Sequence, residues 1–253
     1  MGARLTRAKA KIAAAGIPFA VPGPDHWADR LNSVLTVIYL IFNAGYTNGP
    51  TAGRDLCAEA IFLAQMLDHL RGEQPEAEGS LALMLITHAR RNARTDGQGA
   101  TVPMADQDRA LWDGPMIADG LTLLDAAIAR NVVGPFQFKA AIAACHVQHA
   151  GPDWPQIAAL YRSLLRFEPT PVVALNHAVA RAEMGELSGA LMDMAGLAAQ
   201  LGDYQPFHAA RADLLARSGQ TPESIAAYGH AIATAPSAAD AAFLTKRRNR
   251  LML

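Results

Sequence analysis

Cysteine and histidine side chains near residue 147 are the first candidates for chemistry in this chain. Cys145, His146 and His149 form its densest group of possible metal ligands, and Cys145 and His149 would lie one turn apart on a helix. A stable metal site needs three or four ligands held by further hydrogen bonds. No second group of ligands has a matching spacing. The sequence therefore predicts a buried cysteine beside surface histidines, with no metal and no cofactor.

A cluster of arginines follows the apolar pattern LALMLITHAR. Arg90, Arg91 and Arg94 come close together, and on a helix Arg90 and Arg94 would share a face. Asp108 and Arg109 lie in the polar segment downstream. We expect a half-buried network in which the arginines pair with carboxylates and fix that segment onto the helices. The alternative is a binding site for an anionic ligand that converges on Arg90, Arg94 and Asp108.

Catalytic motifs are missing from the sequence. It contains no GxGxxG after a strand, no GxxxxGK[ST], no HExxH and no GxSxG. Asp55 and Glu59 have helical spacing, but general acid–base catalysis would need a pocket that shifts their pKa values. We therefore expect that the chain is not an enzyme.

The composition of the chain excludes several classes of protein. The 253 residues are 51% hydrophobic and 18% charged, with a formal net charge of -1, which excludes a disordered chain and a strongly basic nucleic-acid binder. The chain has only two cysteines, which suits a reducing cytoplasm. The longest apolar run, residues 34–42, is about half of the ~20 residues that a membrane-spanning helix needs. We expect a cytoplasmic protein with no membrane segment.

The elements that must position these residues are helical by pattern. Ala, Leu, Met and Arg dominate, the breaks are clusters of Gly, Pro and Asp, and no segment alternates as a strand would. The sequence predicts an all-α fold. The expected helices are 3–15, 27–43, 53–71, 76–93, 115–130, 135–149, 154–166, 171–184, 187–200, 206–218, 222–234 and 238–251.

The C-terminal half contains an internal repeat. Gly151, Gly185 and Gly219 are 34 residues apart, and each lies between two helical patterns. A 34-residue period of helix–turn–helix units is typical of tetratricopeptide repeats. We therefore expect a helical domain over residues 26–131, followed over 132–253 by degenerate repeats of this type and a capping helix.

The last unit, GQTPESIAAYGHAIATAP, resembles the tetratricopeptide family well. Tyr228 stands at the aromatic position, Ala231 at the second small position, and Pro236 closes the unit. Ser224 stands where the family prefers alanine.

The N-terminal segment ARLTRAKAKIAAAGIPFAVP is similar to a DNA-reading element. It resembles the end of the second helix-turn-helix in extracytoplasmic-function RNA polymerase sigma factors that carry a tetratricopeptide extension. The resemblance continues through RLNSVLTVIYLIFNAGY, DQDRALWD, PFQFKAAIAACH and PTPVVALNHAVA, and so covers essentially the whole chain. It implies that residues 1–25 are the remnant of that element and a linker, with Arg4, Arg7 and Lys11 as DNA contacts. The other sigma domains would precede Met1.

The resemblance implies a non-catalytic extension that acts in transcription initiation by contacting the sigma domains, RNA polymerase or another protein. Alone, the chain should not bind specific DNA, because one helix remnant cannot fix its register on a duplex. A free-standing repeat scaffold for an unrelated partner, and a receptor for a small anionic ligand, remain alternatives.

The family's repeats bind a helix or an extended segment in a groove lined by the first helix of each unit. The groove positions carried over are Phe138, Ala141, Cys145, Gln148, His149, Val172, Leu175, Val179, Glu183, Ala209, Asp213 and Arg217. The chain also departs from the family, which usually has Glu at Ala44 and Arg at Phe62. We expect apolar packing in place of any polar contact between these two positions.

Overall fold

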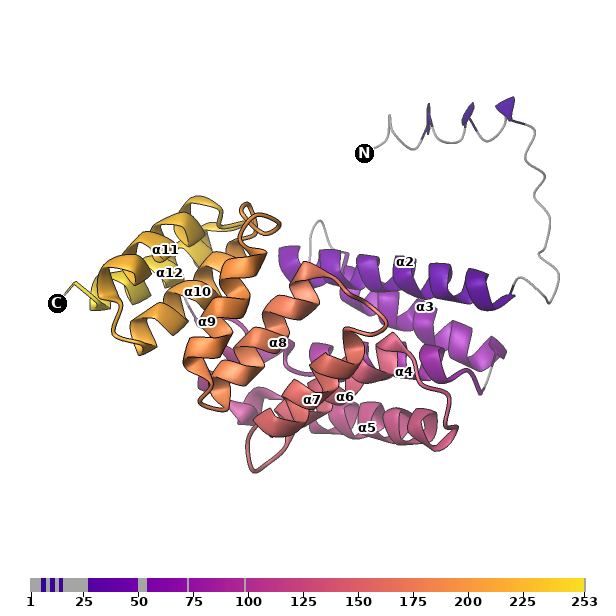
Figure 1. Ribbon diagram of the computed structural model, residues 1–253. Helices are drawn as coiled ribbons and strands as arrows, with labels where there is room; N and C mark the ends of the chain where they lie inside the picture. The colour runs from indigo at the N-terminus through magenta and orange to yellow at the C-terminus, as the bar shows by residue number, and fades with distance from the viewer. Residues whose placement is uncertain are drawn as a thin grey trace. The chain divides into compact units, whose positions relative to one another are not determined.

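The computed structural model describes residues 6–7, 10–11, 14–15, 27–49, 54–71, 73–97 and 99–252 (Figure 1). In these ranges the secondary structure consists of eleven α-helices, three short 3-10 turns and one isolated bridge, without a β-strand. The all-α prediction is confirmed. The chain divides into two compact units, Met1–Val37 and Ile38–Leu253. The helix Trp27–Asn48 begins in the first unit, and all later elements belong to the second. Most of the helix predicted over 3–15 lies outside the described residues.

The first helices of the chain precede the repeats and form a core around α4. Ile38 and Phe42 of α2 pack with Ala60 and Ala64 of α3 and with Met84 of α4. α4 is buried along nearly its whole length because α3, α5 and α6 all pack against it. The bounds are Trp27–Asn48 for α2, Leu56–Arg71 for α3, Pro75–His88 for α4 and Gly114–Ala129 for α5.

Two glycines allow the neighbours of α4 to approach closely. A Cβ added to Gly120 of α5 would lie 2.7 Å from Cγ1 of Ile86, and one added to Gly79 would lie 2.9 Å from the backbone nitrogen of Gln137. Both distances are shorter than any ordinary carbon contact, so glycine is required where α4 meets α5 and α6.

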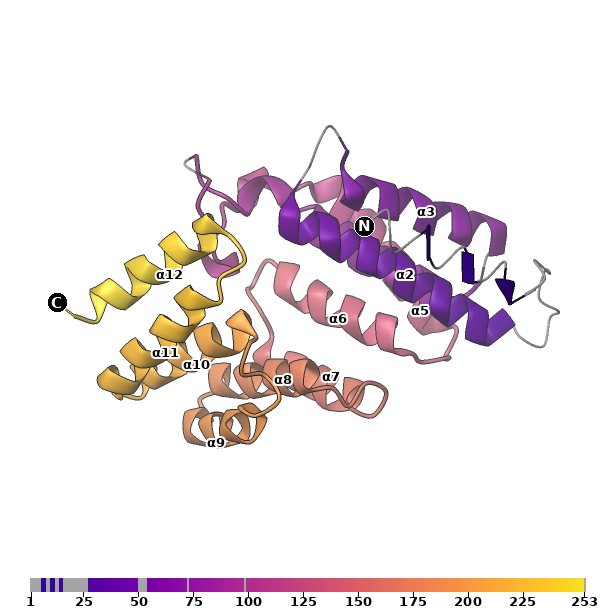
Figure 2. The same cartoon turned by 90° about the horizontal axis from the view of Figure 1, so that it is seen from above.

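The remaining helices form three consecutive pairs and a final single helix. Successive helices from α8 to α12 pack side by side (Figures 1 and 2). Gly185 and Gly219 follow the first helices of the second and third pairs with φ values of 94° and 79°, a conformation that glycine adopts without strain. The pairs are α6 (Pro135–Val147) with α7 (Trp154–Leu164), α8 (Pro171–Glu183) with α9 (Leu187–Leu197), and α10 (Gln205–Arg217) with α11 (Thr221–Ala233), followed by α12 (Ala238–Arg250).

Local sequence explains where several helices begin. The side chains of Asp153, Thr170 and Ser237 accept hydrogen bonds from backbone N–H groups in the first turns of α7, α8 and α12. Prolines occupy the first turn of most of the repeat helices, where the missing N–H has no cost.

Within the described ranges, none of the helices combines the length and the apolar character that a membrane-spanning segment requires.

One error in the predicted helices lies after His88, where α4 ends. The predicted helix over 76–93 would need Ala89 O to accept a bond from residue 93, but Ala89 O accepts from the backbone N–H of Asp113 at 2.9 Å. The chain then turns through a 3-10 segment, Arg91–Ala93. The prediction over 135–149 is also too long, because α6 ends at Val147. In contrast, α2 continues to Asn48, beyond the predicted residue 43.

Candidate functional site

The charged groove positions of the repeats pair with one another. Arg217 at the end of α10 forms an ion pair with Glu183 at the end of α8, and its Nη1 lies 3.6 Å from Oδ2 of Asp213. Nη2 of Arg217 also donates to the carbonyl of Ala182 at 3.2 Å. Arg247 of α12 joins the group at 3.1 Å from Asp213. Three of the predicted partner-binding residues therefore connect α8, α10 and α12, and their charges are balanced within the fold.

The uncharged groove positions separate into buried and accessible ones. Leu175 is only 2% exposed and packs in the core between α8, α9 and α10, so the prediction that it lines the groove is corrected. Phe138 is half-buried, with its ring 5.5 Å from that of Phe167. Gln148 and His149 are exposed, but they follow the end of α6 rather than extend its face.

The predicted network of arginines and carboxylates is mostly absent. Arg91 makes a loose ion pair with Asp113, with Nη1 and Oδ2 3.7 Å apart. Among the described residues, it is the only one of the five predicted network residues that forms an ion pair. Asp108 instead caps the 3-10 turn Arg109–Leu111 by accepting from the N–H of Ala110. The physical reason is the early end of α4: Arg91–Ala93 form a 3-10 turn, so Arg90 and Arg94 do not share the face of an α-helix.

Aromatic faces and neutral oxygens take the place of the expected carboxylates. Arg94 donates to the carbonyl of Tyr46 at 2.8 Å, with its guanidinium carbon 3.3 Å from the centre of the Tyr46 ring. Arg109 donates to the carbonyl of Gln148 at 2.6 Å and lies over the ring of Trp112. These contacts attach the segment after α4 to α2 and to the end of α6.

Arg90 is the most buried of the arginines, with 8% of its surface exposed. Its Nη1 lies 3.3 Å from Oε1 of Gln107, and its guanidinium is 5.9 Å from the centre of the Trp112 ring. Burial away from water lowers the pKa of Arg90 from its ordinary value. Its Nε has no hydrogen-bond partner among the described residues.

A cavity of about 450 Å³ lies beside this segment, and its lining differs from the predicted ligand site. Arg91, Arg94 and His88 line it together with Asp55 at the start of α3 and Asp240 in the first turn of α12. Arg90 and Asp108 do not contribute to it. The predicted convergence of Arg90, Arg94 and Asp108 is therefore replaced by a different set of residues.

Cys145 packs in the hydrophobic core between the repeat helices. The Cys145 thiol is buried, which raises its pKa, and the ring of His146 contacts Trp154 edge-on at 5.3 Å. Burial also lowers the pKa of His146 to about 4, so its imidazole is neutral at neutral pH. His149 lies beyond the end of α6 and does not stand one turn from Cys145 on the helix. Across the described ranges, no three Cys, His, Asp or Glu side chains are arranged to hold a metal ion.

An exposed apolar strip on α3 was not among the predicted sites. Phe62, Met66 and Leu70, spaced by four residues, are 57%, 44% and 72% exposed and border a shallow depression of about 370 Å³. The expectation that Phe62 packs against apolar neighbours is corrected. The opposite face of α3 is buried in the core, so α3 is apolar on both sides. The sequence CAEAIFLAQML indicates a helix that is apolar on both sides, because it has apolar residues at nearly every helical position.

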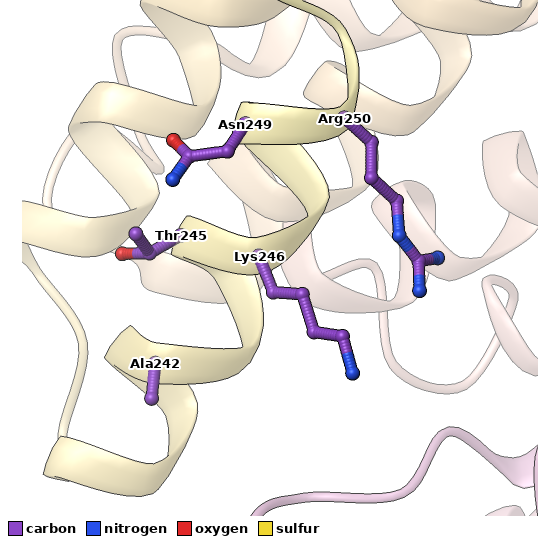
Figure 3. Close-up of a pocket in the computed structure, with 5 residues that line it drawn as sticks. All are labelled: Ala242, Thr245, Lys246, Asn249 and Arg250. Atoms are coloured by element: carbon purple, nitrogen blue, oxygen red, sulfur yellow. The ribbon is translucent and has the colours of Figure 1, made fainter. Parts of the chain in front are cut away.

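The outer face of α12 is open and polar. Ala242, Thr245, Lys246, Asn249 and Arg250 project from it along a depression of about 600 Å³ (Figure 3). All five residues belong to one helix, so the depression is a helix surface rather than an enclosed site. A polar outer face suits a helix that caps the end of a repeat stack.

The predicted DNA-contact residues are only partly described. Arg7 and Lys11 are exposed and in helical conformation, and Arg4 lies outside the described residues.

Comparison with known proteins relates the chain to one sequence family and to one fold. Residues 30–128 match a family of unknown function, DUF6596. An uncharacterized protein of Rhizobium meliloti (strain 1021) is 43% identical over 257 residues, and the alignment covers 99% of this chain and 61% of that protein. A thermophilic tetratricopeptide-repeat protein of Thermus thermophilus aligns with a TM-score of 0.54 at 16% identity, covering 87% of this chain and 98% of that chain. Residues 30–128 are thus similar to the DUF6596 family, the fold is like that of a tetratricopeptide-repeat protein, and the chain spans about three fifths of the length of its Rhizobium relative.

Proposed function

We propose that this chain is a non-catalytic, protein-binding extension of an extracytoplasmic-function RNA polymerase sigma factor. In this role it acts in the cytoplasm, in transcription initiation, by contacting the sigma domains, RNA polymerase or another protein. The similarity of residues 3–22 to a DNA-reading element and the motifs that follow it support this role. The Rhizobium relative also supports it, because that protein contains further sequence outside the aligned region.

The apolar strip on α3 is the observation that carries the protein-binding role. A helix that is apolar on both sides is normally covered on both sides, yet Phe62, Met66 and Leu70 face solvent. Contiguous exposed apolar surface of this kind marks contact sites between proteins. A partner that covers the strip would remove three large apolar side chains from water.

The repeat groove is the second candidate surface for a peptide segment. Its charged end is occupied by the pairing of Glu183, Asp213 and Arg217, so the positions left for a partner are those at the start and middle of α8. Val172 is exposed there, and Val179 is half-buried two turns further along the helix. A partner segment would therefore bind mainly through apolar contacts in this part of the groove.

The first experiment determines the size of the native polypeptide. Peptides from this region would be detected by mass spectrometry in the source organism, after separation by mass. We expect a species well above 26.9 kDa that also yields sigma-domain peptides. A species of 26.9 kDa alone would contradict the extension and leave a free-standing repeat scaffold.

The second experiment tests the strip in the complete polypeptide with run-off transcription. Met66→Glu places a charge in the strip, and Met192→Glu, at a 74% exposed methionine of α9, is the matched control. Both changes lie on the surface and should alter the free energy of unfolding by no more than about 0.5 kcal/mol. We expect Met66→Glu to lower promoter-dependent transcription about tenfold, the effect of losing one strong contact, and Met192→Glu to leave it unchanged. Equal activity of the two variants would exclude the strip as the contact.

A further inference from the structure

The cavity between the segment after α4 and the start of α12 has the dimensions of a small-molecule site. Its volume of about 450 Å³ falls within the range of ligand pockets in proteins. Tyr46 and Cys57 contribute to one wall, and Ser237, which precedes α12, contributes to another together with Asp240 of α12. The hydrogen bond from the Thr101 hydroxyl to Oδ1 of Asp240, 2.7 Å long, joins the two walls.

The carboxylates of the cavity already accept hydrogen bonds from other groups of the protein. Oδ1 of Asp55 accepts from the backbone N–H groups of Cys57 and Ala58 at the start of α3. Asp240 accepts from the hydroxyls of Thr101 and Ser237, one on each carboxylate oxygen. These carboxylates therefore stabilise the walls of the cavity and are poor candidates for binding a cation.

The cationic groups of the cavity, in contrast, are incompletely paired. Arg94 makes one hydrogen bond, to the carbonyl of Tyr46, and within the described residues no carboxylate forms an ion pair with it. Arg91 uses only its Nη1, which lies 3.4 Å from the carbonyl of His88 and 3.7 Å from the carboxylate of Asp113. Two guanidinium groups line the cavity, each with N–H donors to spare, and such groups can bind a planar or tetrahedral anion.

His88 adds an independent indication of a ligand. Its side chain is about nine-tenths buried, lines the cavity, and makes no hydrogen bond with the described residues. Burial and the nearby charge of Arg91 both lower its pKa, so at neutral pH the imidazole is neutral and can donate one hydrogen bond and accept another. The ring nitrogens of His88 are not among the sealed, unpartnered atoms of the described residues, so they are accessible to a molecule bound in the cavity.

We infer that this cavity binds a small organic anion, through its carboxylate or phosphate group, at Arg91 and Arg94. His88 would form a hydrogen bond with the polar body of the same molecule, and the hydroxyl oxygens of Thr101 and Ser237, whose protons go to Asp240, would accept from it. The site is distinct from the one that the sequence predicted, since it excludes Arg90 and Asp108. It does not depend on the proposed role in transcription and can be tested on the chain alone.

Binding would connect the DUF6596-like region to the end of the repeats. The cavity is lined by residues of α2, α3 and α4 on one side and of α12 on the other. A ligand held by both sides would slow amide hydrogen exchange in the segments that carry Thr101 and Ser237. The bound anion would then hold these two parts of the chain together.

Isothermal titration calorimetry of the whole chain at constant ionic strength tests this inference. Succinate and citrate represent carboxylates, and inorganic phosphate and pyrophosphate represent phosphates. We expect saturable binding in at least one of these two arms, and the arm that binds identifies the anionic group. Arg91→Gln should weaken that binding at least about tenfold, because it removes one charge-assisted contact.

The control variant is Arg166→Gln, which removes an exposed arginine beyond the end of α7 and should leave the affinity unchanged. Arg94→Gln should weaken binding like Arg91→Gln, but it also removes the hydrogen bond to Tyr46. Its melting temperature is therefore measured first, and Arg91→Gln, which leaves that bond in place, decides the test. The inference is overturned if none of the four probes binds saturably, or if Arg91→Gln and Arg166→Gln affect binding equally.

Discussion

The guanidinium of Arg217 on α10 pairs with the carboxylate of Glu183 on α8, and these residues are 34 positions apart, one repeat period. Each stands two residues before a glycine with positive φ, Gly219 and Gly185 respectively. Equivalent positions of successive units thus carry opposite charges, and stacking of the units brings those charges together. The equivalent residue of the first unit, His149, lies beyond the end of α6 and is outside this pairing.

This pairing predicts a measurable coupling between α8 and α10. Both side chains are partly exposed, so we expect a coupling energy of about 0.5–1 kcal/mol from a double-mutant cycle of Glu183→Gln and Arg217→Met in urea. Arg217→Met should be the more destabilising single change, because it also removes the bonds to Asp213 and Ala182. A coupling energy of zero, or one that does not shrink in about 1 M salt, would contradict the ion pair.

The close approach of α5 to α4 predicts an unusual effect at Gly120. Replacing a glycine inside a helix by alanine normally stabilises a protein by about 0.5–1 kcal/mol. At Gly120 the new methyl group would overlap Ile86, and we expect destabilisation of about 1–3 kcal/mol. Gly229→Ala in α11 is the matched control, because no atom lies within 4 Å of its new Cβ, and it should raise the melting temperature. Stabilisation by both changes would show that the two helices are further apart.

The neutral state of His146 predicts how stability depends on pH. The folded-state pKa is about 4 against an ordinary value of 6.5, so the unfolded chain takes up a proton that the native state excludes. The contribution of His146 to stability is therefore complete above pH 6.5 and is lost as the pH falls towards 4, by at most about 1.4 kcal/mol per unit.

His146→Phe should reduce this slope while keeping the contact with Trp154, as measured by urea unfolding between about pH 7.5 and 4.5. A smaller slope should remain, because burial also lowers the pKa values of His88 and His177. An unchanged slope in the variant would mean that His146 has the same pKa in the native and unfolded states.

Ser224 offers a test of how the last repeat accommodates a departure from its family pattern. The side chain is fully buried, and its hydroxyl donates to the carbonyl of Ala212 at 2.7 Å, across the contact of α10 with α11. Ser224→Ala restores the family residue and should change the free energy of unfolding by about 1 kcal/mol or less. Ser224→Leu should cost several times more, since the two helices leave no room for a larger side chain. Calorimetric melting of both variants checks the difference.

Much of the fold could be predicted from local patterns. The 34-residue spacing of Gly151, Gly185 and Gly219 predicted the helix pairs, because a period in the sequence has to appear as a repeated unit in the chain. Prolines and capping residues predicted most helix starts within one residue. The end of α4 could not be predicted, because it depends on the distant residue Asp113, whose backbone N–H binds the carbonyl of Ala89.

The candidate sites, like the fold, could be predicted from the sequence only in part. The sequence by itself identified the arginines and the groove charges as polar residues in an apolar chain, and it determined an all-α fold of helical repeats. Only the tertiary structure decided that Arg94 lies against Tyr46, that Glu183 pairs with Arg217, and that Phe62 is exposed. The reason is physical: helical periodicity is a local property of the chain, whereas the partner of a charge and the burial of an apolar face depend on which distant elements pack beside them.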